Sequence, residues 1–541
     1  MVAIGIDLGT TNTCVASYTS NGVEVIQNHT GSRTTPSFVL INDDEIRVGK
    51  SAKEANVKNS QNLVYDAKRM IGKVHSDKDL QSDISTLKWP FKVDKDTYDR
   101  PILNIPNLKT RVKKTYLPEE ISAFVLQEIK NVVEDLHLGH GKNLADAVIT
   151  VPAYFNDSQK KATEDAANLA GLKVLKLLSE PSAAGLAFCY QRLKEDLSNE
   201  HTILVYDLGG GTFDVSIMYI CNGQIEVKCV NGDTHLGGND FDARLIEFLI
   251  KKFKEKSDED VKNNKKALWK LRDAAIKAKE HLSAHLHAEI SIDSLQNDKD
   301  FEYDIKRSEF DTICQDLFNR TLEIVDKALK DANMSPSSIH EILLVGGSSR
   351  IPKIQEMLKT KFGGDKINKT INGDEAVAYG AAIQAAIING EIERQCNMVL
   401  MDVTPLSIGT DVKKCSCGKS CNCTRYTSVI IPRNTKIPTK KTRRFETRKD
   451  NQTKVKIDIL EGENSEADKN HLLGSLTIEI PKNKAGAEKI EVSYDIDRNG
   501  MLTVNAVNLS TGGQANATIN YNKKRLNSDD VKEMLTKLKI K

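Results

Sequence analysis

The sequence predicts an α/β protein of two similar lobes, followed by a domain of β-strands and one short C-terminal helix. From Met1 to about Gly390, short β-branched runs alternate with longer segments of helical periodicity, which is typical of an α/β architecture. A strand that ends in an acid and a glycine turn occurs twice in this region, 200 residues apart. Beyond Asp402 the pattern changes to alternating apolar residues separated by turns, which indicates antiparallel sheets.

The first elements follow from their periodicity. Residues 147–151 and 203–206 are short β-branched runs, as expected of buried strands. Residues 160–170 and 245–253 have apolar side chains at helical spacing. Residues 398–401 are a short apolar stretch between charged regions, and they mark the change from one pattern to the other.

The C-terminal elements are predicted in the same way. Alternation over 490–496 and 502–506 flanks the pair Asn499-Gly500, which favours a hairpin turn. Residues 527–530 are a good N-cap sequence, and the apolar residues that follow form one helical stripe.

Composition and charge exclude several classes of protein. The chain has 541 residues, which predicts three or four domains at about 150 residues each. Lys and Arg number 77 against 75 for Asp and Glu, and a net charge of +2 argues against a protein that binds nucleic acid through its phosphates. No apolar stretch reaches the roughly 18 residues of a spanning helix, and no signal-type block precedes Asp7. We therefore expect a cytoplasmic protein without membrane or nucleic-acid partners.

The repeated turns predict a site for a polyphosphate and a metal ion. Asp7 ends the first strand and Asp207 ends its repeat, and in each copy glycines and a threonine follow. Glycines let backbone N–H groups approach phosphate oxygens, and a nearby carboxylate can hold Mg²⁺ through water. A third turn of this kind occurs at 342–350. One such turn alone could be no more than a tight hairpin, but the repetition favours two lobes that clamp one polyphosphate between them.

These segments are similar to those of the 70-kilodalton heat-shock protein (Hsp70) chaperones. The resemblance extends from Ala3 to about Lys541 and includes the order and spacing of every block. It implies an actin-like, two-lobed ATPase domain over 1–394, an apolar interdomain linker over 395–403 and a β-sandwich peptide-binding domain over 404–525. The motifs that carry it are DLGTT (7–11), DAKRMIG (66–72), VPAYFND (151–157), EPSAA (180–184), DLGGGTFD (207–214), GGSSRIP (346–352) and DVTPLS (402–407).

The resemblance also implies roles for individual residues in the ATPase domain. Asp7 and Asp207 would hold a hydrated magnesium ion with Glu180 close by, and Lys68 would touch the γ-phosphate and orient the attacking water. Pro152 and Lys160 would relay the nucleotide state to the linker. The residues that would contact ATP or ADP are Gly9, Thr10, Thr11, Asn12, Gly209, Gly210, Gly211, Thr212, Lys279, Ser283, Gly346, Gly347, Ser348, Arg350 and Asp374.

The helix that would touch the adenosine departs from the family pattern. Positions that are usually Glu and Arg in the family are Ile276 and Glu280 here. The family Arg stacks on adenine, whereas a glutamate offers no cation for such a contact. We expect weaker nucleotide affinity or faster release, with the hydrolytic residues intact.

The peptide site implied by the resemblance also differs from the family. Its apolar floor would be Phe445, Val455, Ile457 and Met501. The two residues expected to arch over a bound peptide are Lys413 and Arg448, where the family uses small or apolar side chains, and an apolar wall position is Thr410. Since the neighbouring strands are also basic, we expect a preference for acidic or less apolar peptides.

Four cysteines lie in an insertion of the substrate loop. Cys415, Cys417, Cys421 and Cys423 have the spacing Cys-x-Cys-x₃-Cys-x-Cys. Four thiolates can bind one Zn²⁺ tetrahedrally, although Cys-x-Cys is tighter than the usual spacing of structural zinc sites. A soft-metal site, redox-responsive thiols and an inert polar loop are the three alternatives, and the metal site is favoured.

The resemblance therefore predicts a divergent, cytosolic-type Hsp70 chaperone in which ATP hydrolysis changes the affinity for unfolded polypeptide segments. J-domain co-chaperones and nucleotide-exchange factors are the implied partners. Residues 526–541 would begin a helical lid of which most is missing, so bound peptide should leave quickly. The alternative is a non-cycling regulator or holdase in which ATP is mainly structural. A small-molecule kinase with the same two-lobed fold is disfavoured by the β-rich C-terminal domain.

Overall fold

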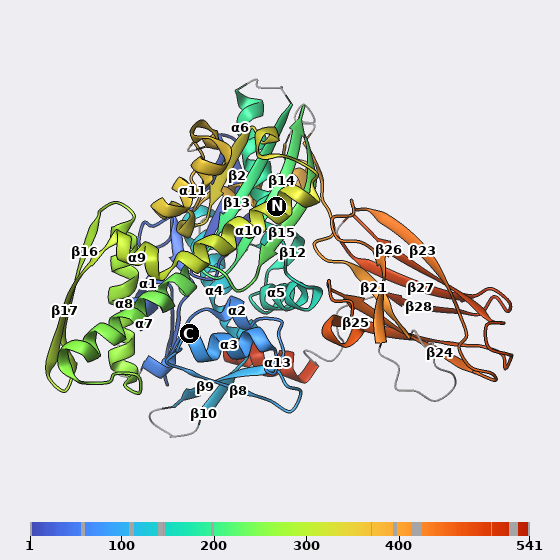
Figure 1. Cartoon of the computed structure of the whole chain (residues 1–541), viewed down its shortest axis with the longest axis horizontal. Coiled ribbons are helices and arrows are strands. Elements are labelled where there is room, and N and C mark those ends of the chain that lie inside the picture. The colour runs from blue at the N-terminus through green and yellow to red at the C-terminus, as the bar shows by residue number, and fades with distance from the viewer. Residues whose placement is uncertain are drawn as a thin grey trace.

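The structure is a computed structural model that describes residues 3–55, 60–107, 113–138, 144, 146–195, 200–368, 370–392, 398–413, 425–498, 500–518 and 528–538. It confirms the predicted fold class. Two lobes built on mixed sheets form one part of the molecule, and a β-sandwich projects to one side (Figure 1).

Lobe I is built on a six-stranded sheet in the order β12-β11-β1-β2-β3, with β4 also paired to β2. Strand β1 lies parallel to β11 and antiparallel to β2. All six residues of β11 are buried, which explains the run of β-branched and small residues that follows Asp146. The strands are β1 (Ala3–Leu8), β2 (Asn12–Thr19), β3 (Gly22–Val25), β4 (Thr34–Pro36), β11 (Asp146–Val151) and β12 (Lys173–Ser179).

Lobe II repeats this arrangement, which gives the internal sequence repeat a structural basis. Its six strands follow the order β19-β18-β13-β14-β15-β20, so that an antiparallel group of three again adjoins two parallel strands. The strands are β13 (His201–Leu208), β14 (Phe213–Cys221), β15 (Gln224–Asp233), β18 (Glu341–Val345), β19 (Ile367–Asn368) and β20 (Val399–Met401).

Helices fill the space between the two sheets and cover their outer faces. Helices α6 (Glu180–Lys194) and α12 (Ala376–Asn389) pack against each other, and α12 also contacts β1 and β2. The predicted helices are confirmed as α5 (Asp157–Leu169) and α7 (Gly238–Ser257). Helix α5 begins earlier than predicted because Asn156 caps it and accepts a hydrogen bond from the Gln159 N–H at 2.9 Å.

The other elements of the lobes are shorter or more peripheral. They are α1 (Lys50–Lys53), α2 (Ala67–Met70), α3 (Lys78–Thr86), α4 (Pro118–Val133), α8 (Lys265–Leu282), α9 (Arg307–Ile313), α10 (Gln315–Asp331), α11 (Pro352–Phe362), β5 (Val39–Ile41), β6 (Ile46–Val48), β7 (Leu63–Val64), β8 (Lys92–Lys95), β9 (Pro101–Pro106), β10 (Lys113–Tyr116), β16 (His287–Gln296) and β17 (Lys299–Lys306).

The sandwich consists of two four-stranded sheets in the orders β22-β21-β24-β25 and β23-β26-β27-β28. Their facing residues, such as Ile459, Val492 and Tyr494, are fully buried in one core. The predicted hairpin is confirmed as β26 and β27. The strands are β21 (Ile408–Lys413), β22 (Arg425–Ile431), β23 (Thr439–Glu446), β24 (Lys454–Glu461), β25 (His471–Glu479), β26 (Lys489–Ile496), β27 (Leu502–Asn508) and β28 (Gln514–Thr518).

The sandwich is docked on lobe II through the apolar segment that precedes it. Strand β20 pairs in parallel with β15, with Leu400 opposite Ile225, and so adds one strand to the lobe II sheet. Asn434 accepts a hydrogen bond from the Val230 N–H at 2.9 Å, and Arg433 pairs with Asp331 at 2.8 Å. The linker therefore acts as a strand in this arrangement.

The C-terminal helix α13 (Ser528–Leu538) packs on lobe I (Figure 1). Met534 is buried in the apolar core of that lobe, and Lys537 pairs with the buried Glu120 at 3.2 Å. Residues 526–541 were expected to begin a lid for the peptide site. The described part of this segment packs against α4 and α5, where Met534 of its apolar stripe is buried.

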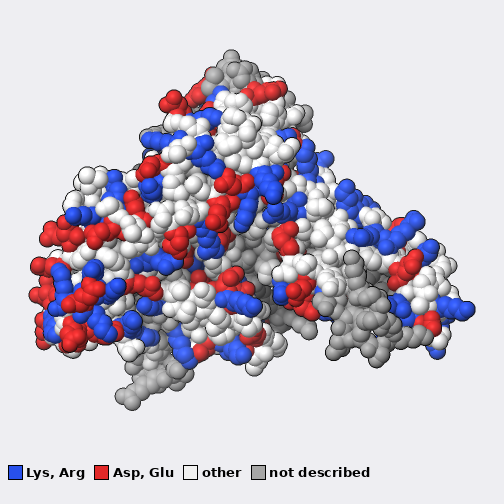
Figure 2. All heavy atoms as spheres, viewed as in Figure 1, with Lys and Arg blue, Asp and Glu red and all other residues white. Residues whose placement is uncertain are grey.

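Charged residues of both signs are interspersed over the face of the molecule shown in Figure 2. None of the helices that the structure describes is both long enough and apolar enough to span a bilayer.

Candidate functional site

A cleft between the two lobes contains the largest group of predicted site residues. It encloses about 530 Å³ and is lined by every residue assigned above to metal, phosphate or nucleoside, with the exception of Gly211. Gly211 lies directly behind this wall, because a Cβ atom on it would fall 2.8 Å from Thr10. The tertiary structure thus brings together residues that are as far apart in the sequence as Asp7 and Asp374.

The two repeated turns meet across the cleft. The first joins β1 to β2, and the second joins β13 to β14, where the Gly209 N–H donates to the Thr212 carbonyl at 3.1 Å. A Cβ atom on Gly210 would lie 2.0 Å from Oγ1 of Thr11. Glycine is therefore required for the turn of lobe II to reach the turn of lobe I, and backbone N–H groups and hydroxyls from both lobes border one space.

The third turn lies beside the second and borders the same cleft. Gly346 follows β18 with a φ of 77°, and a Cβ atom there would lie 2.4 Å from the Leu208 carbonyl oxygen. The hydroxyl of Ser348 donates to the Gly209 carbonyl at 3.0 Å. The third turn thus lies directly against the backbone of the second turn.

Four carboxylates gather beside these turns: Glu180, Asp207 and Asp214 are buried, and Asp7 is half-buried. Burial and then the charge of Glu180 raise the pKa of Asp7 to about 7. Burial, Glu180, Asp214 and Asp7 all raise the pKa of Asp207, and its Oδ2 atom has no hydrogen-bond partner among the described residues. Asp214 lies opposite Asp207 in the β13–β14 pair, and burial raises its pKa to about 8. Carboxylates crowded in this way favour a nearby cation.

This donor set fits a hydrated magnesium ion. No three His, Cys, Asp or Glu side chains in the described part of the chain are placed to ligate one ion directly. Mg²⁺ usually keeps several of its waters and takes only one or two carboxylates, so Asp7 and Asp207 suffice as its protein partners.

Lys68 places its ammonium group beside these carboxylates. Its ammonium lies 2.5 Å from Oε1 of Glu180 and 5.9 Å from the centre of the Phe155 ring. The side chains of Lys68 and Glu180 are 7% and 9% exposed, so little water screens this charge. A buried ammonium at the edge of a phosphate site can stabilise negative charge that develops during phosphoryl transfer.

The other end of the cleft is formed by α8 and the third turn. Lys279 pairs with the buried Asp242 at 2.7 Å, and Arg350 pairs with Asp374 at 2.5 Å. Ile276 and Glu280 both line the cleft, so the two departures from the family pattern face the space where a nucleoside would lie.

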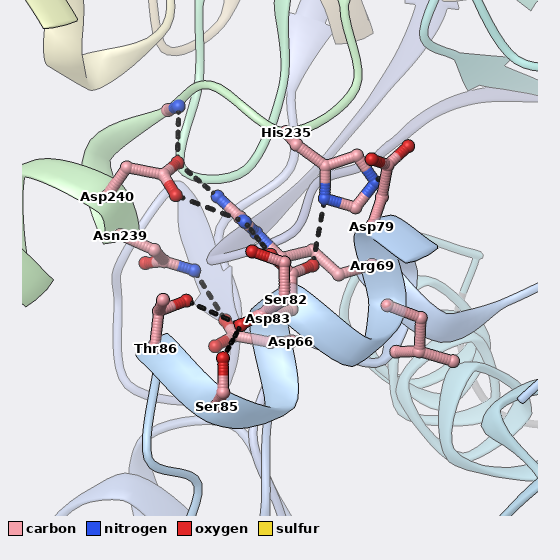
Figure 3. Close-up of polar contacts among 12 residues, drawn as sticks. Asp66, Arg69, Asp79, Ser82, Asp83, Ser85, Thr86, His235, Asn239 and Asp240 are labelled. Atoms are coloured by element: carbon pink, nitrogen blue, oxygen red, sulfur yellow. Dashed lines mark hydrogen bonds and ion pairs between the residues drawn. The ribbon is translucent and has the colours of Figure 1, made fainter. Parts of the chain in front are cut away.

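A buried ionic cluster joins the lobes beside the cleft (Figure 3). Arg69 of α2 pairs with Asp83 of lobe I at 3.1 Å and with Asp240 of lobe II at 2.5 Å. Asn239 donates to Asp66 across the same boundary at 2.8 Å. Sequence reasoning identified Asp66 and Arg69 only as parts of a motif, because nothing in the sequence indicates their partners in lobe II.

A second contact path leads from the carboxylates to the sandwich. The N–H of Ala153, which follows the buried Pro152, donates to Asp214 at 3.1 Å. Farther along, the N–H of Asp157 lies 3.4 Å from Oε2 of Glu461 on β24, and Lys160 lies 3.7 Å from Asp157. The sequence alone did not identify Asp214 and Glu461 as functional residues. The second acid of DLGGGTFD was a signal for Asp214, but Cys14 stands at that place in the first copy.

The structure groups three of the four residues predicted for the peptide-site floor. Phe445 and Val455 pack against the core that contains Ile457. Met501 is 44% exposed in the turn between β26 and β27, at the opposite end of β26 from Phe445. Ile490 lies opposite Phe445 in the strand register and is buried. The register therefore separates Met501 from Phe445 and places Ile490 beside Phe445.

The remaining predicted residues of this region are only partly described. Arg448 is exposed, in the segment between β23 and β24, and Thr410 is buried in β21. Lys413 ends β21, and its side chain lies outside the described part of the structure. The four cysteines Cys415, Cys417, Cys421 and Cys423 also lie outside the described residues.

Comparisons with known proteins agree with this geometry. The family model described as "Hsp70 protein" matches residues 3–540. The chain is 45% identical over 538 residues to heat shock cognate 70 kDa protein 3 of Dictyostelium discoideum, which covers 99% of this chain and 82% of the relative. It is 45% identical to the heat shock 70 kDa protein of Neurospora crassa (98% and 80%) and 43% identical to a ribosome-associated molecular chaperone of Saccharomyces cerevisiae (98% and 84%). The chain belongs to the Hsp70 family of ATP-dependent chaperones and ATPases.

Proposed function

We propose that the cleft between the lobes binds and hydrolyses ATP through the residues that line it. The contact between the turn of Thr11 and the turn of Gly210 carries this proposal, since donors from both lobes border the same space. The N–H groups and hydroxyls of the three turns would bind the phosphates, and Lys279, Ser283 and Arg350 would border the nucleoside. Asp7 and Asp207 would hold a hydrated Mg²⁺, which neutralises phosphate charge when it is bound.

Lys68 has the central role in the hydrolytic step. Its ammonium would touch the γ-phosphate and orient the attacking water, while Glu180 keeps the side chain in place. The test is ATP turnover by the whole chain with and without an unfolded peptide, and with Lys68→Ala as the control. Turnover that survives in Lys68→Ala would show that the step depends on other groups.

The nucleotide state would be coupled to the sandwich through the linker and α5. We assign residues 1–394 to the ATPase domain, 395–403 to the linker, 404–525 to the peptide-binding domain and 526–541 to the start of a lid region. The pairing of β20 with β15 and the contact of Asp157 with Glu461 support this assignment, because both bridge the two domains. Pro152 and Lys160 lie on the same path.

The sandwich would bind unfolded or extended segments of polypeptide. Phe445, Val455 and Ile457 support an apolar floor, and we add Ile490 to it on the grounds of the strand register. Lys413 and Arg448 would favour acidic or less apolar segments. A peptide array tests this preference, and selection of leucine flanked by basic residues would contradict it.

Partners and location follow from the family. We propose J-domain co-chaperones and nucleotide-exchange factors as partners, and the cytoplasm as the location. Co-purification with each class of co-chaperone and fractionation of cells are the direct tests.

A second candidate function is a holdase or regulator in which ATP is mainly structural. The positions of Ile276 and Glu280 in the cleft favour it, because they remove a carboxylate and a cation from the nucleoside end. Peptide stimulation of ATP turnover separates the two functions. A chain that binds peptide but shows no stimulated turnover would be a holdase.

A further inference from the structure

A second cavity lies between the lobes, on the other side of Arg272 from the nucleotide cleft. It encloses about 320 Å³, within the range of sites for small ligands. Lobe I contributes Tyr65 and the segment 86–90 after α3, and lobe II contributes parts of α7 and α8. Arg272 lines both cavities and therefore lies in the wall between them.

The walls of this cavity are largely aromatic. Trp89 and Trp269, which are the two tryptophans of the chain, both line it. Trp269 reaches from α8 into the apolar core of lobe I, and its ring centre lies 5.9 Å from that of Tyr65. The indole N–H of Trp89 donates to Asp66 at 2.8 Å, which fixes the orientation of its ring. An aromatic wall of this kind favours an aromatic or apolar ligand over a fully polar one.

A buried arginine also lines the cavity. Arg272 is 5% exposed, its guanidinium lies 4.6 Å from the centre of the Tyr65 ring, and one of its nitrogens lies 3.6 Å from Asp66. Its Nε and Nη1 atoms have no hydrogen-bond partner among the residues that the structure describes. The positive charge of this guanidinium, which is buried beside the cavity, would stabilise a negatively charged ligand there.

The charge around the cavity is also positive. Lys265 bridges the lobes by donating to the Pro90 carbonyl at 2.8 Å, and desolvation lowers the pKa of its ammonium. The charged residues in the walls are four cations and one carboxylate: Lys88, Lys262, Lys265, Arg272 and Glu247. A negatively charged ligand would be stabilised by this surplus.

We propose that this cavity is a binding site for a small aromatic anion. The planar ring lies among Trp89, Trp269 and Tyr65, and a carboxylate, sulfonate or phosphate group faces Arg272 and Lys265. The site is distinct from the ATP cleft and from the peptide site, and the proposal does not depend on the roles assigned to either.

The fluorescence of the two tryptophans allows a direct test. The probe is 1-anilinonaphthalene-8-sulfonate, an aromatic anion that accepts energy from tryptophan. It is titrated into the whole chain with Mg-ATP and a peptide present in excess, so that the other apolar sites are filled. We expect saturable, tryptophan-sensitised emission at one probe per chain. N-phenyl-1-naphthylamine, which has the same rings and no sulfonate, is expected to bind about tenfold more weakly, because it carries no negative charge for the surrounding cations to stabilise.

Two variants and a matched control complete the test. Lys265→Gln is expected to weaken sulfonate binding about tenfold, while Lys266→Gln, an exposed neighbour outside the cavity wall, is expected to leave it unchanged. Ala243→Phe should fill part of the cavity and abolish the sensitised signal, with an unchanged thermal transition as evidence of folding. Absence of a saturable signal, equal binding of the two probes, or an equal effect of Lys265→Gln and Lys266→Gln would overturn the proposal.

Discussion

The ammonium of Lys68 lies 2.5 Å from Oε1 of Glu180, and the two side chains come from lobe I and from the helix that begins after β12. Both are more than nine-tenths buried. The ion pair fixes a lysine whose positive charge lowers the pKa of both Asp7 and Asp207. The ion pair therefore holds the Lys68 ammonium close to the place where negative charge would develop on the phosphate.

Replacing Lys68 by Ala is expected to reduce the rate of ATP hydrolysis in a single turnover by about 10²- to 10³-fold. The loss follows because the substitution removes the ammonium that would stabilise the developing phosphate charge. Nucleotide binding should change much less, since the turns supply most of the phosphate contacts. Rapid-quench measurement of hydrolysis checks this, and Lys53→Ala, at the edge of the same cleft, serves as the comparison. A similar fall in both variants would contradict a specific role for Lys68.

Replacing Glu280 by Arg is expected to strengthen adenine-nucleotide binding by about 1 kcal/mol, or roughly fivefold, because a guanidinium can stack on the base. Titration with a fluorescent adenine nucleotide measures the effect. Glu289→Arg makes the same change of charge at an exposed position on β16 and should leave the affinity unchanged. If both substitutions strengthen binding equally, the gain reflects net charge and the stacking argument fails.

Docking of the sandwich on α5 is expected to depend on pH. In the docked arrangement, burial and then the charge of Asp157 raise the pKa of Glu461 from 4.5 to about 8; Lys160 opposes this shift and Glu463 adds to it. In the undocked state the carboxyl returns toward 4.5, so docking takes up a proton. Its contribution is fully present below about pH 4.5 and is lost as the pH rises through 8.

Energy transfer between dyes on lobe I and on the sandwich measures this docking. Glu461→Gln should remove most of the change between pH 6 and about 9, because the amide carries no proton to lose. Glu479→Gln, an exposed carboxyl on the same sandwich, is the control. A pH profile that survives in Glu461→Gln would assign the effect to another group.

Helix α13 is expected to leave lobe I when its apolar contact is removed. Met534 is 4% exposed in the core of the lobe, so Met534→Ala should lose about 2 kcal/mol or more of packing and raise amide exchange in the helix at least tenfold. Hydrogen exchange followed by mass spectrometry reports on this segment. Leu535→Ala is the comparison, since Leu535 is 39% exposed. Equal exchange in the two variants would show that Met534 does not hold the helix.

The cluster Cys415, Cys417, Cys421 and Cys423 is expected to bind one zinc ion per chain, because four thiolates in nine residues can supply a complete tetrahedral set. Elemental analysis of protein purified without a chelator measures the content. A variant with all four positions changed to Ser should lose the metal, while Cys221→Ser should retain it. Thiols that react freely in the purified protein, with no metal present, would favour the redox or inert alternatives.

Much of the fold and of the cleft could be predicted from the sequence. The periodicity of 147–151 and 160–170 indicated a strand and a helix correctly, because both are local patterns. The repeat of DLGTT as DLGGGTFD predicted two similar sheets, which the common strand order confirms. Met501 shows the limit of such reasoning. Whether Met501 lies beside Phe445 depends on the register of β23, β26 and β27. That register is set by pairing across the sheet, which the local sequence does not reveal.

The amino-acid sequence by itself determined the class of fold, the family and the chemistry of the phosphate turns, since glycine, threonine and aspartate act there through their own backbone freedom and side-chain oxygens. Only the tertiary structure decided which groups face one another: Arg69 with Asp240, Asp157 with Glu461, and Met534 with the core of lobe I. These pairs are separated by more than a hundred residues, and burial of apolar surface between whole elements brings them together. No local pattern carries that information.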